Sequence, residues 1–139
     1  MPDLPAEPAR TRLVELRKGL LRLHKALLDS EAAAYQRDVA RIRSSAHLLE
    51  LALNDPWFGW LHELSGLIVM IDEALDDRRG PVAGDTARFL EEAAVLLTPA
   101  ENGTGFRRHY FAALQRDPEV VLAHAAMMKT LASLRAKTF

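Results

Sequence analysis

The chain has 139 residues, of which 49% are hydrophobic and 27% are charged, and these values are typical of one compact domain with an adequate core. Its formal net charge of -1 gives no global field that would attract nucleic acid or an anionic membrane, so we expect neither as a partner. The absence of cysteine excludes disulfides, thiolate nucleophiles and Cys-ligated metal sites.

The first eight residues contain three prolines and are predicted to be a disordered lead-in, with residues 9–139 as a single helical domain. This start lacks a basic stretch followed by an apolar core, so it is not a secretory signal, and we expect a cytoplasmic protein. No uninterrupted apolar run approaches the ~20 residues that a membrane-spanning helix needs.

Helical periodicity dominates the first half of the chain. A leucine-rich stripe predicts a helix over residues 9–42, in which Gly19 allows a close approach of another backbone. A short helix over 46–53 follows. The central helix, 55–75, starts at Asp55 and Pro56, a capping residue followed by a proline where its missing N–H costs nothing. Its predicted core anchors are Trp57, Trp60, Leu64 and Ile68.

The second half repeats the same pattern. We expect helices over 85–97, 106–114 and 118–136, with Asp117-Pro118 repeating the device at Asp55-Pro56. Nothing alternates with period two, so the sequence predicts an all-α fold. The favoured architecture is an antiparallel up-and-down four-helix bundle with two helices broken at Asp-Pro. The segments 46–53 and 55–75 would form one bent rod, and 104–136 another.

The segments LHKALLD, DPWFGWLHELSGLIVMIDEAL and YFAALQRDPEVVLAHA resemble those of small, uncharacterised bacterial helical proteins whose central motif has the form DPWFxWL. The resemblance covers most of residues 13–126. It implies a bacterial, stand-alone domain, and it implies no activity and no functional residue.

Catalytic signatures are missing from the sequence, which contains no GxSxG, SxxK or phosphate-binding glycine loop. The histidines are the most informative titratable set. His24 and His124 lie on apolar helix faces, and His62 lies at a similar depth on a flank. Such a layer could bind haem, a transition metal or a small molecule. ExxH pairs and HxxxH are absent, so we favour neutral, hydrogen-bonded histidines with no cofactor and no metal.

Two acidic residues continue the line of His24 at seven-residue spacing. Glu31 and Asp38 are either buried partners of His109 or Tyr110, or simply exposed. We favour exposure, because this part of the helix is rich in alanine.

The outer side of the central helix carries few charges, although a bundle helix normally shows a charged side to water. A symmetric partner would cover this surface, so we predict a homodimer or a larger assembly, and a non-enzymatic role in protein association. The alternative is that the short segments cover it within one chain. The candidate interface residues are Phe58, Gly59, Gly66, Val69 and Met70.

Overall fold

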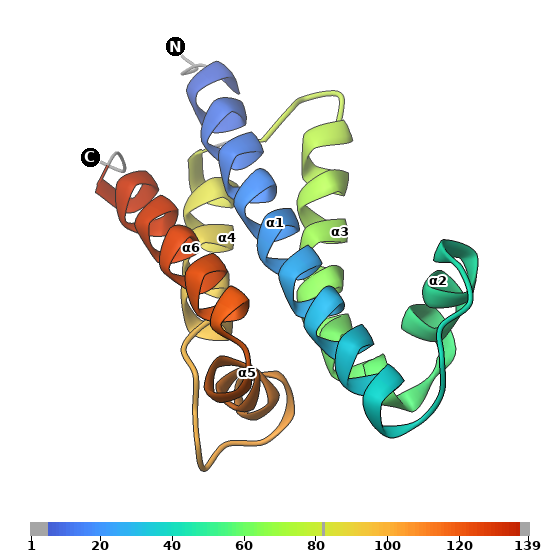
Figure 1. Cartoon of the computed structure of the whole chain (residues 1–139). Helices are drawn as coiled ribbons and strands as arrows, with labels where there is room; N and C mark the ends of the chain where they lie inside the picture. The colour runs from blue at the N-terminus through green and yellow to red at the C-terminus, as the bar shows by residue number, and fades with distance from the viewer. Residues whose placement is uncertain (1–5, 82, 137–139) are drawn as a thin grey trace.

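A computed structural model describes residues 6–81 and 83–136 of the chain (Figure 1). The described residues form helices and no strand, which confirms the all-α prediction. The elements in chain order are α1 (Ala6–Asp38), α2 (Ser45–Asn54), the 3-10 helix η1 (Pro56–Leu61), α3 (His62–Asp76), α4 (Ala83–Leu96), α5 (Gly105–Arg116) and α6 (Pro118–Ala136).

Helix α1 is the axis of the molecule, and α3, α4, α6 and η1 all pack against it. Figure 1 shows α1 running between α3 on one side and α6 on the other. The leucine stripe expected from the sequence is buried along this helix, because the leucines recur on one face and meet each neighbour in turn. The buried leucines are Leu13, Leu16, Leu20, Leu23 and Leu27.

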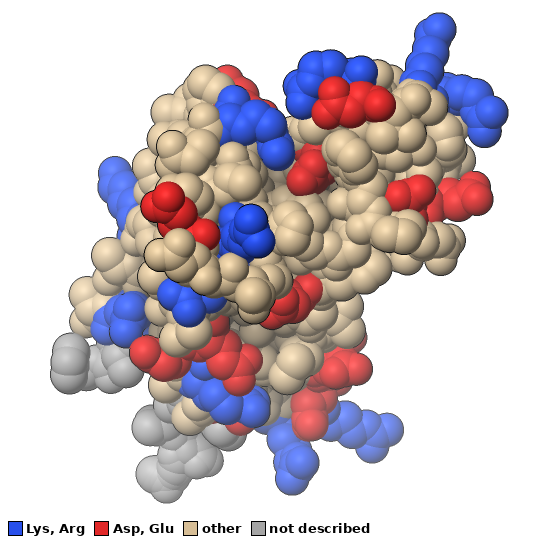
Figure 2. All heavy atoms as spheres, turned by 90° about the horizontal axis from the view of Figure 1, so that it is seen from below, with Lys and Arg blue, Asp and Glu red and all other residues tan. Residues whose placement is uncertain are grey.

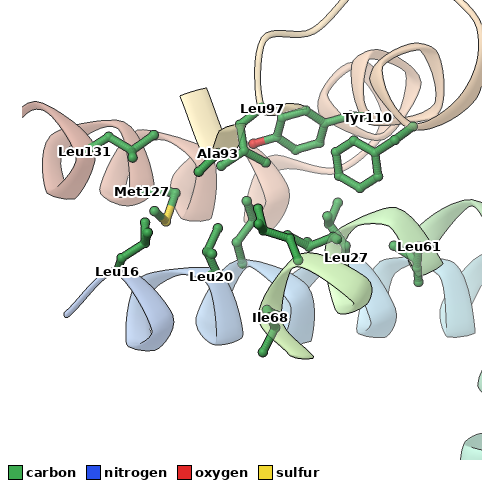
Figure 3. Packing of buried hydrophobic residues seen from close by; sticks show 14 of the residues in the cluster. Leu16, Leu20, Leu27, Leu61, Ile68, Ala93, Leu97, Tyr110, Met127 and Leu131 are labelled. Carbon is green, nitrogen blue, oxygen red and sulfur yellow. The ribbon is translucent and has the colours of Figure 1, made fainter. Parts of the chain in front are cut away.

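The first and last helices approach closely at Gly19. A Cβ atom at this position would lie 2.8 Å from the Sδ atom of Met127 in α6, so the missing side chain makes room for Met127. Figure 3 shows Met127 directed toward Leu16 and Leu20 of α1. The prediction for Gly19 was a close approach of another backbone, whereas the neighbouring atoms belong to the side chains of Met127 and Thr130 in α6.

Charge complementarity joins α1 to α3. Arg17 forms an ion pair with Asp72, and the Arg10 guanidinium donates a hydrogen bond of 2.8 Å to the carbonyl of Leu75. The basic start of the chain and its acidic middle thus attract each other across an antiparallel helix pair. Both charges of the Arg17 pair are more than a third exposed, so this pair contributes at most about 1 kcal/mol.

The bounds of α1 differ from those predicted. The helix begins at Ala6, so residues 6–8 of the expected lead-in are helical, while residues 1–5 lie outside the described part. It ends at Asp38 rather than Ile42, because the Val39 and Ala40 amides both bond to the Tyr35 carbonyl. The Ile42 amide then donates to the Gln36 side chain, which turns the chain away from the helix axis.

Neither pair of segments joined at Asp-Pro forms one bent rod. Helix α2 stands apart from α3 and packs chiefly on η1, and α5 is seen nearly end-on in Figure 1 where α6 is seen from the side. The central helix also starts as a 3-10 helix over Pro56–Leu61 and becomes α-helical at His62.

The surface seen from below carries both signs of charge, interspersed and separated by uncharged side chains (Figure 2). No large patch of a single sign is present on this face. Within the part of the chain that the structure describes, no helix combines the length and the apolarity needed to cross a membrane.

Candidate functional site

The structure places two of the three candidate histidines near each other. His24 is half-buried on α1, and its pKa is lowered by burial and, to a lesser extent, by the charge of His62. His62 is exposed at the start of α3, where its Nε2 atom lies 3.0 Å from the carbonyl oxygen of Ala52 in α2. This contact fixes one end of α2 against α3.

The third histidine, His124, belongs to a different contact. Its Nδ1 atom is hydrogen-bonded to the hydroxyl group of Tyr110, which is fully buried on α5. Burial raises the pKa of Tyr110 above its usual range and lowers the pKa of His124. The phenol therefore keeps its proton and the imidazole is favoured in its neutral form, and Nδ1 of His124 is occupied by a protein partner.

A metal or haem site would need several ligands that converge on one point. Within residues 6–81 and 83–136, no group of three or more histidine, aspartate or glutamate side chains is arranged to hold a metal ion. The expected layer of three imidazoles is divided between a contact of α1 with α3 and a contact of α5 with α6.

Glu31 is the most deeply buried charged side chain that the structure describes, with 6% of its surface exposed. Its carboxylate accepts hydrogen bonds from two indole N–H groups, at 2.8 Å from Trp60 and 3.2 Å from Trp57. The Arg116 guanidinium lies 3.8 Å from the same carboxylate and donates to Ser30 at 3.2 Å. The favoured expectation of an exposed Glu31 is thus wrong, because two tryptophans and an arginine cover it.

The two tryptophans are half-buried rather than fully enclosed. Trp60 stacks on His109, with ring centroids 5.3 Å apart, and Trp57 meets the ring of Tyr35 edge-on at 5.7 Å. Each indole therefore packs its rings on α1 or α5 and directs its N–H inward to Glu31. The carboxylate joins α1, η1 and α5, and every polar group in the cluster has a partner, so its role is to position these elements.

The remaining core anchors, Leu64 and Ile68, are buried as predicted. Phe58 differs from its expected position on the exposed flank, since it has 0% exposed surface and lies in the core. The 3-10 geometry of η1 turns its side chain inward, so Phe58 is removed from the candidate interface.

The outer face of α3, which we define as Gly66, Val69 and Met70, is uncovered. Val69 is 54% exposed and Met70 44% exposed. A Cβ atom at Gly66, or at Gly59 in η1, would meet no other atom within 4 Å. The short segments of this chain therefore leave the surface open, contrary to the alternative of internal covering.

Helix α2 carries a second uncovered apolar surface that was not singled out in the sequence. None of its ten residues is buried, although the helix is rich in leucine. Leu49 and Leu53 are each 61% exposed, and with Ala46 they form a line of apolar side chains that we call the α2 stripe. The available signal was the pattern AHLLELAL over residues 46–53, because its four leucines do not all fit on one buried face of a three-turn helix.

Comparison of the chain with protein-family models, with curated proteins and with solved structures returns no match.

Proposed function

We propose that this protein is a non-enzymatic bacterial helical protein that acts by associating with a second copy of itself. Its contact surfaces are the α2 stripe and the outer face of α3. The observation that carries the proposal is that α2 buries none of its residues within its own chain. In this proposal α1, α3, α4 and α6 form an antiparallel four-helix scaffold, and α2 is the arm that it presents.

The exposed area of the chain supports association. A compact monomer of 15.5 kDa is expected to expose about 7,200 Å² of surface. This chain exposes 8393 Å². The exposed area is about 1,200 Å² above that of a compact monomer of this mass, and this total includes the nine residues outside 6–81 and 83–136. The α2 arm adds to this excess because it stands away from the scaffold.

The chemistry of the two surfaces also favours a protein partner. Both expose apolar side chains, which are typical of interface cores, and the α2 stripe includes one charge, Glu50. Burial of an exposed leucine is worth about 1.5–3 kcal/mol, so covering Leu49 and Leu53 in two chains supplies a large part of the free energy of a dimer. A twofold dimer is the commonest way for identical chains to close such surfaces.

Light scattering coupled to size exclusion, across a range of concentrations, tests this proposal. The wild-type chain is expected to have the mass of a dimer at micromolar concentration. The double variant Leu49→Glu, Leu53→Glu is expected to be a folded monomer, because it places charges on the α2 stripe without touching the core. The control is Val95→Glu on α4, whose parent side chain is 57% exposed, and it should leave the mass unchanged. A wild-type monomer at all concentrations would contradict the proposal.

A further inference from the structure

A groove runs between α1 and α6 on the side of α1 away from α3. Its volume is about 540 Å³, and its walls extend from Gly19 to Ser30 on α1 and from Asp117 to Thr130 on α6. At a rise of 1.5 Å per residue, the α1 wall is about 16 Å long. The floor is made of small or apolar side chains, Ala26, Ala123 and Met127. A groove of this length and lining accepts about three turns of a helix.

The rim of the groove carries opposite charges at its two ends. Arg22 stands toward one end and forms no ion pair or hydrogen bond with any described residue. Asp29, Asp117 and Glu119 gather at the other end. Lys25, between them, is paired with Asp29 at 2.8 Å. A helix that seats here is favoured if it brings an acidic residue to Arg22 and a basic residue to the Asp29 end.

The α2 arm carries this charge pattern in reverse. Arg43 directly precedes its capping serine, and Glu50 lies seven residues further along, both exposed. Seven residues is also the separation of Arg22 from Asp29 on α1. On α1 these seven residues are two helical turns, about 10 Å. On the arm, Arg43 precedes the extended N-cap residue Ser44, so it lies just beyond the start of the helix. Glu50 lies on the same line of the helix as Ala46 and Leu53, so it is within the α2 stripe, and Arg43 lies beyond the N-terminal end of the stripe.

The arm cannot fill the groove of its own chain while η1 stays in place. Figure 1 shows α2 and α6 on opposite sides of α1, with α3 next to α2. The arm is also held at its C-terminal end by the contact of His62 with Ala52 and by its packing on η1. The occupant of the groove must therefore be supplied by another molecule.

We propose that the α2 arm of a second copy of this chain seats in the groove between α1 and α6, antiparallel to α1. In this register Glu50 meets Arg22, Arg43 meets Asp29, Ala46 lies over Ala26, and Leu53 reaches the Gly19 end beside Met127. The antiparallel direction also brings opposite ends of the two helix dipoles together. Two chains that exchange arms reciprocally form a closed twofold dimer with two identical contacts. This inference rests on the proposed function and names the surface that receives the arm, and the outer face of α3 takes no part in this contact.

Charge reversal tests the register. In a sedimentation measurement of the dissociation constant, Glu50→Arg and Arg22→Glu are each expected to weaken the dimer about tenfold or more, because each places like charges in contact. The double variant restores opposite charges and is expected to return to within about threefold of wild type. The matched controls are Glu92→Arg on α4 and Arg108→Glu on α5, both exposed positions, and they should not alter dissociation.

Cross-linking gives an independent readout, since the chain contains no cysteine. Ala46→Cys protein mixed with Ala26→Cys protein is expected to form a mixed disulfide dimer on oxidation. Ala46→Cys mixed with Ala87→Cys, an exposed position on α4, is not expected to do so.

The outcomes separate the two proposals. A dimer that is lost in Leu49→Glu, Leu53→Glu but unaffected by reversal at Arg22 and Glu50 overturns the register and leaves the association intact. Two weakened single variants without rescue in the double variant also overturn it, as does the absence of the mixed disulfide. A wild-type chain that never dimerises overturns both proposals.

Discussion

The two Asp-Pro breaks have almost the same local structure and opposite surroundings. At each break the aspartate amide bonds to the carbonyl four residues before it, Asp55 to Leu51 at 2.8 Å and Asp117 to Ala113 at 3.0 Å. At each break the aspartate Oδ1 accepts the amide hydrogen of the second residue after it, at 2.9 Å. The Asp-Pro sequence therefore sets the same local hydrogen bonds at both breaks. It does not determine how the preceding helix packs.

The packing of the preceding helix depends on which of its side chains are buried. Before the second break, α5 is anchored by three buried side chains, Phe106, Tyr110 and Ala113. Before the first break, α2 has no buried side chain, and it projects as an arm. After the first break, the indoles of Trp57 and Trp60 are drawn to Glu31, and the chain winds as a 3-10 helix before α3 begins. The lesson is that a local signal places a break, and packing on distant residues directs the helices on either side.

The largest effect should come from removing an anchor of α5. Phe106→Ala deletes a ring that is 1% exposed, and we expect a loss of about 3–5 kcal/mol in the free energy of unfolding. Leu53→Ala, on the helix before the other break, should change it by less than about 0.5 kcal/mol at concentrations where the chain does not associate. Urea denaturation followed by circular dichroism measures both values. Equal losses would show that the two helices are anchored alike.

A smaller effect is expected from the carboxylate that holds η1. Glu31→Ala removes the acceptor of two indole N–H groups and the partner of Arg116, and we expect a loss of about 3 kcal/mol, since hydrogen bonds to a charged group are worth about 1.5–3 kcal/mol each.

The matched variant Glu31→Gln keeps one hydrogen-bond acceptor, and its free energy of unfolding should fall by about 1 kcal/mol. Tryptophan emission should shift to longer wavelength in Glu31→Ala, because the half-buried indoles then turn to water. An unchanged emission spectrum would contradict the role of Glu31 as the group that positions η1.

The smallest effect should be a dependence of stability on pH. The folded-state pKa values of His24 and His124 are lowered by burial, so the unfolded chain binds protons more readily than the folded chain. The contribution of these two histidines to the free energy of unfolding is present in full above the usual histidine pKa of about 6.5. It is lost as the pH falls toward their folded-state pKa values.

Urea denaturation at pH 7.5 and pH 5.5 should show the lower stability at pH 5.5. His24→Gln, on α1, should reduce this difference. A stability that rises toward pH 5.5 would contradict the neutral state of the two buried imidazoles.

Much of the fold was visible in the sequence because it depends on local patterns. The leucine periodicity of α1 and the two aspartate caps each act through residues within one or two turns, and each was predicted close to its observed place. The start of α6 at Pro118 and its end at Ala136 also agree with the prediction.

The candidate site was harder to predict because it depends on contacts between distant residues. Glu31 is buried by Trp57, Trp60 and Arg116, which lie 26, 29 and 85 positions away in the sequence. The alanine-rich sequence around Glu31 suggested an exposed helix face, but small side chains here allow the indoles to approach. Tyr110 and His124 meet across the second break, and this partner of His124 was not anticipated. The sequence analysis missed the isolation of α2 because it assumed that the helix before Asp-Pro continues as one rod with the helix after it.

The extensive packing of α1 on α6 joins the beginning of the chain to its end. Contacts between residues far apart in sequence require closure of a long loop before they contribute stability, which slows folding. During synthesis, the leucine stripe of α1 leaves the ribosome before α6, whose Met127 packs toward Leu16 and Leu20. The part of the apolar face of α1 that packs on α6 therefore stays uncovered until α6 has been synthesised. In that interval it is accessible to chaperones and to other nascent chains.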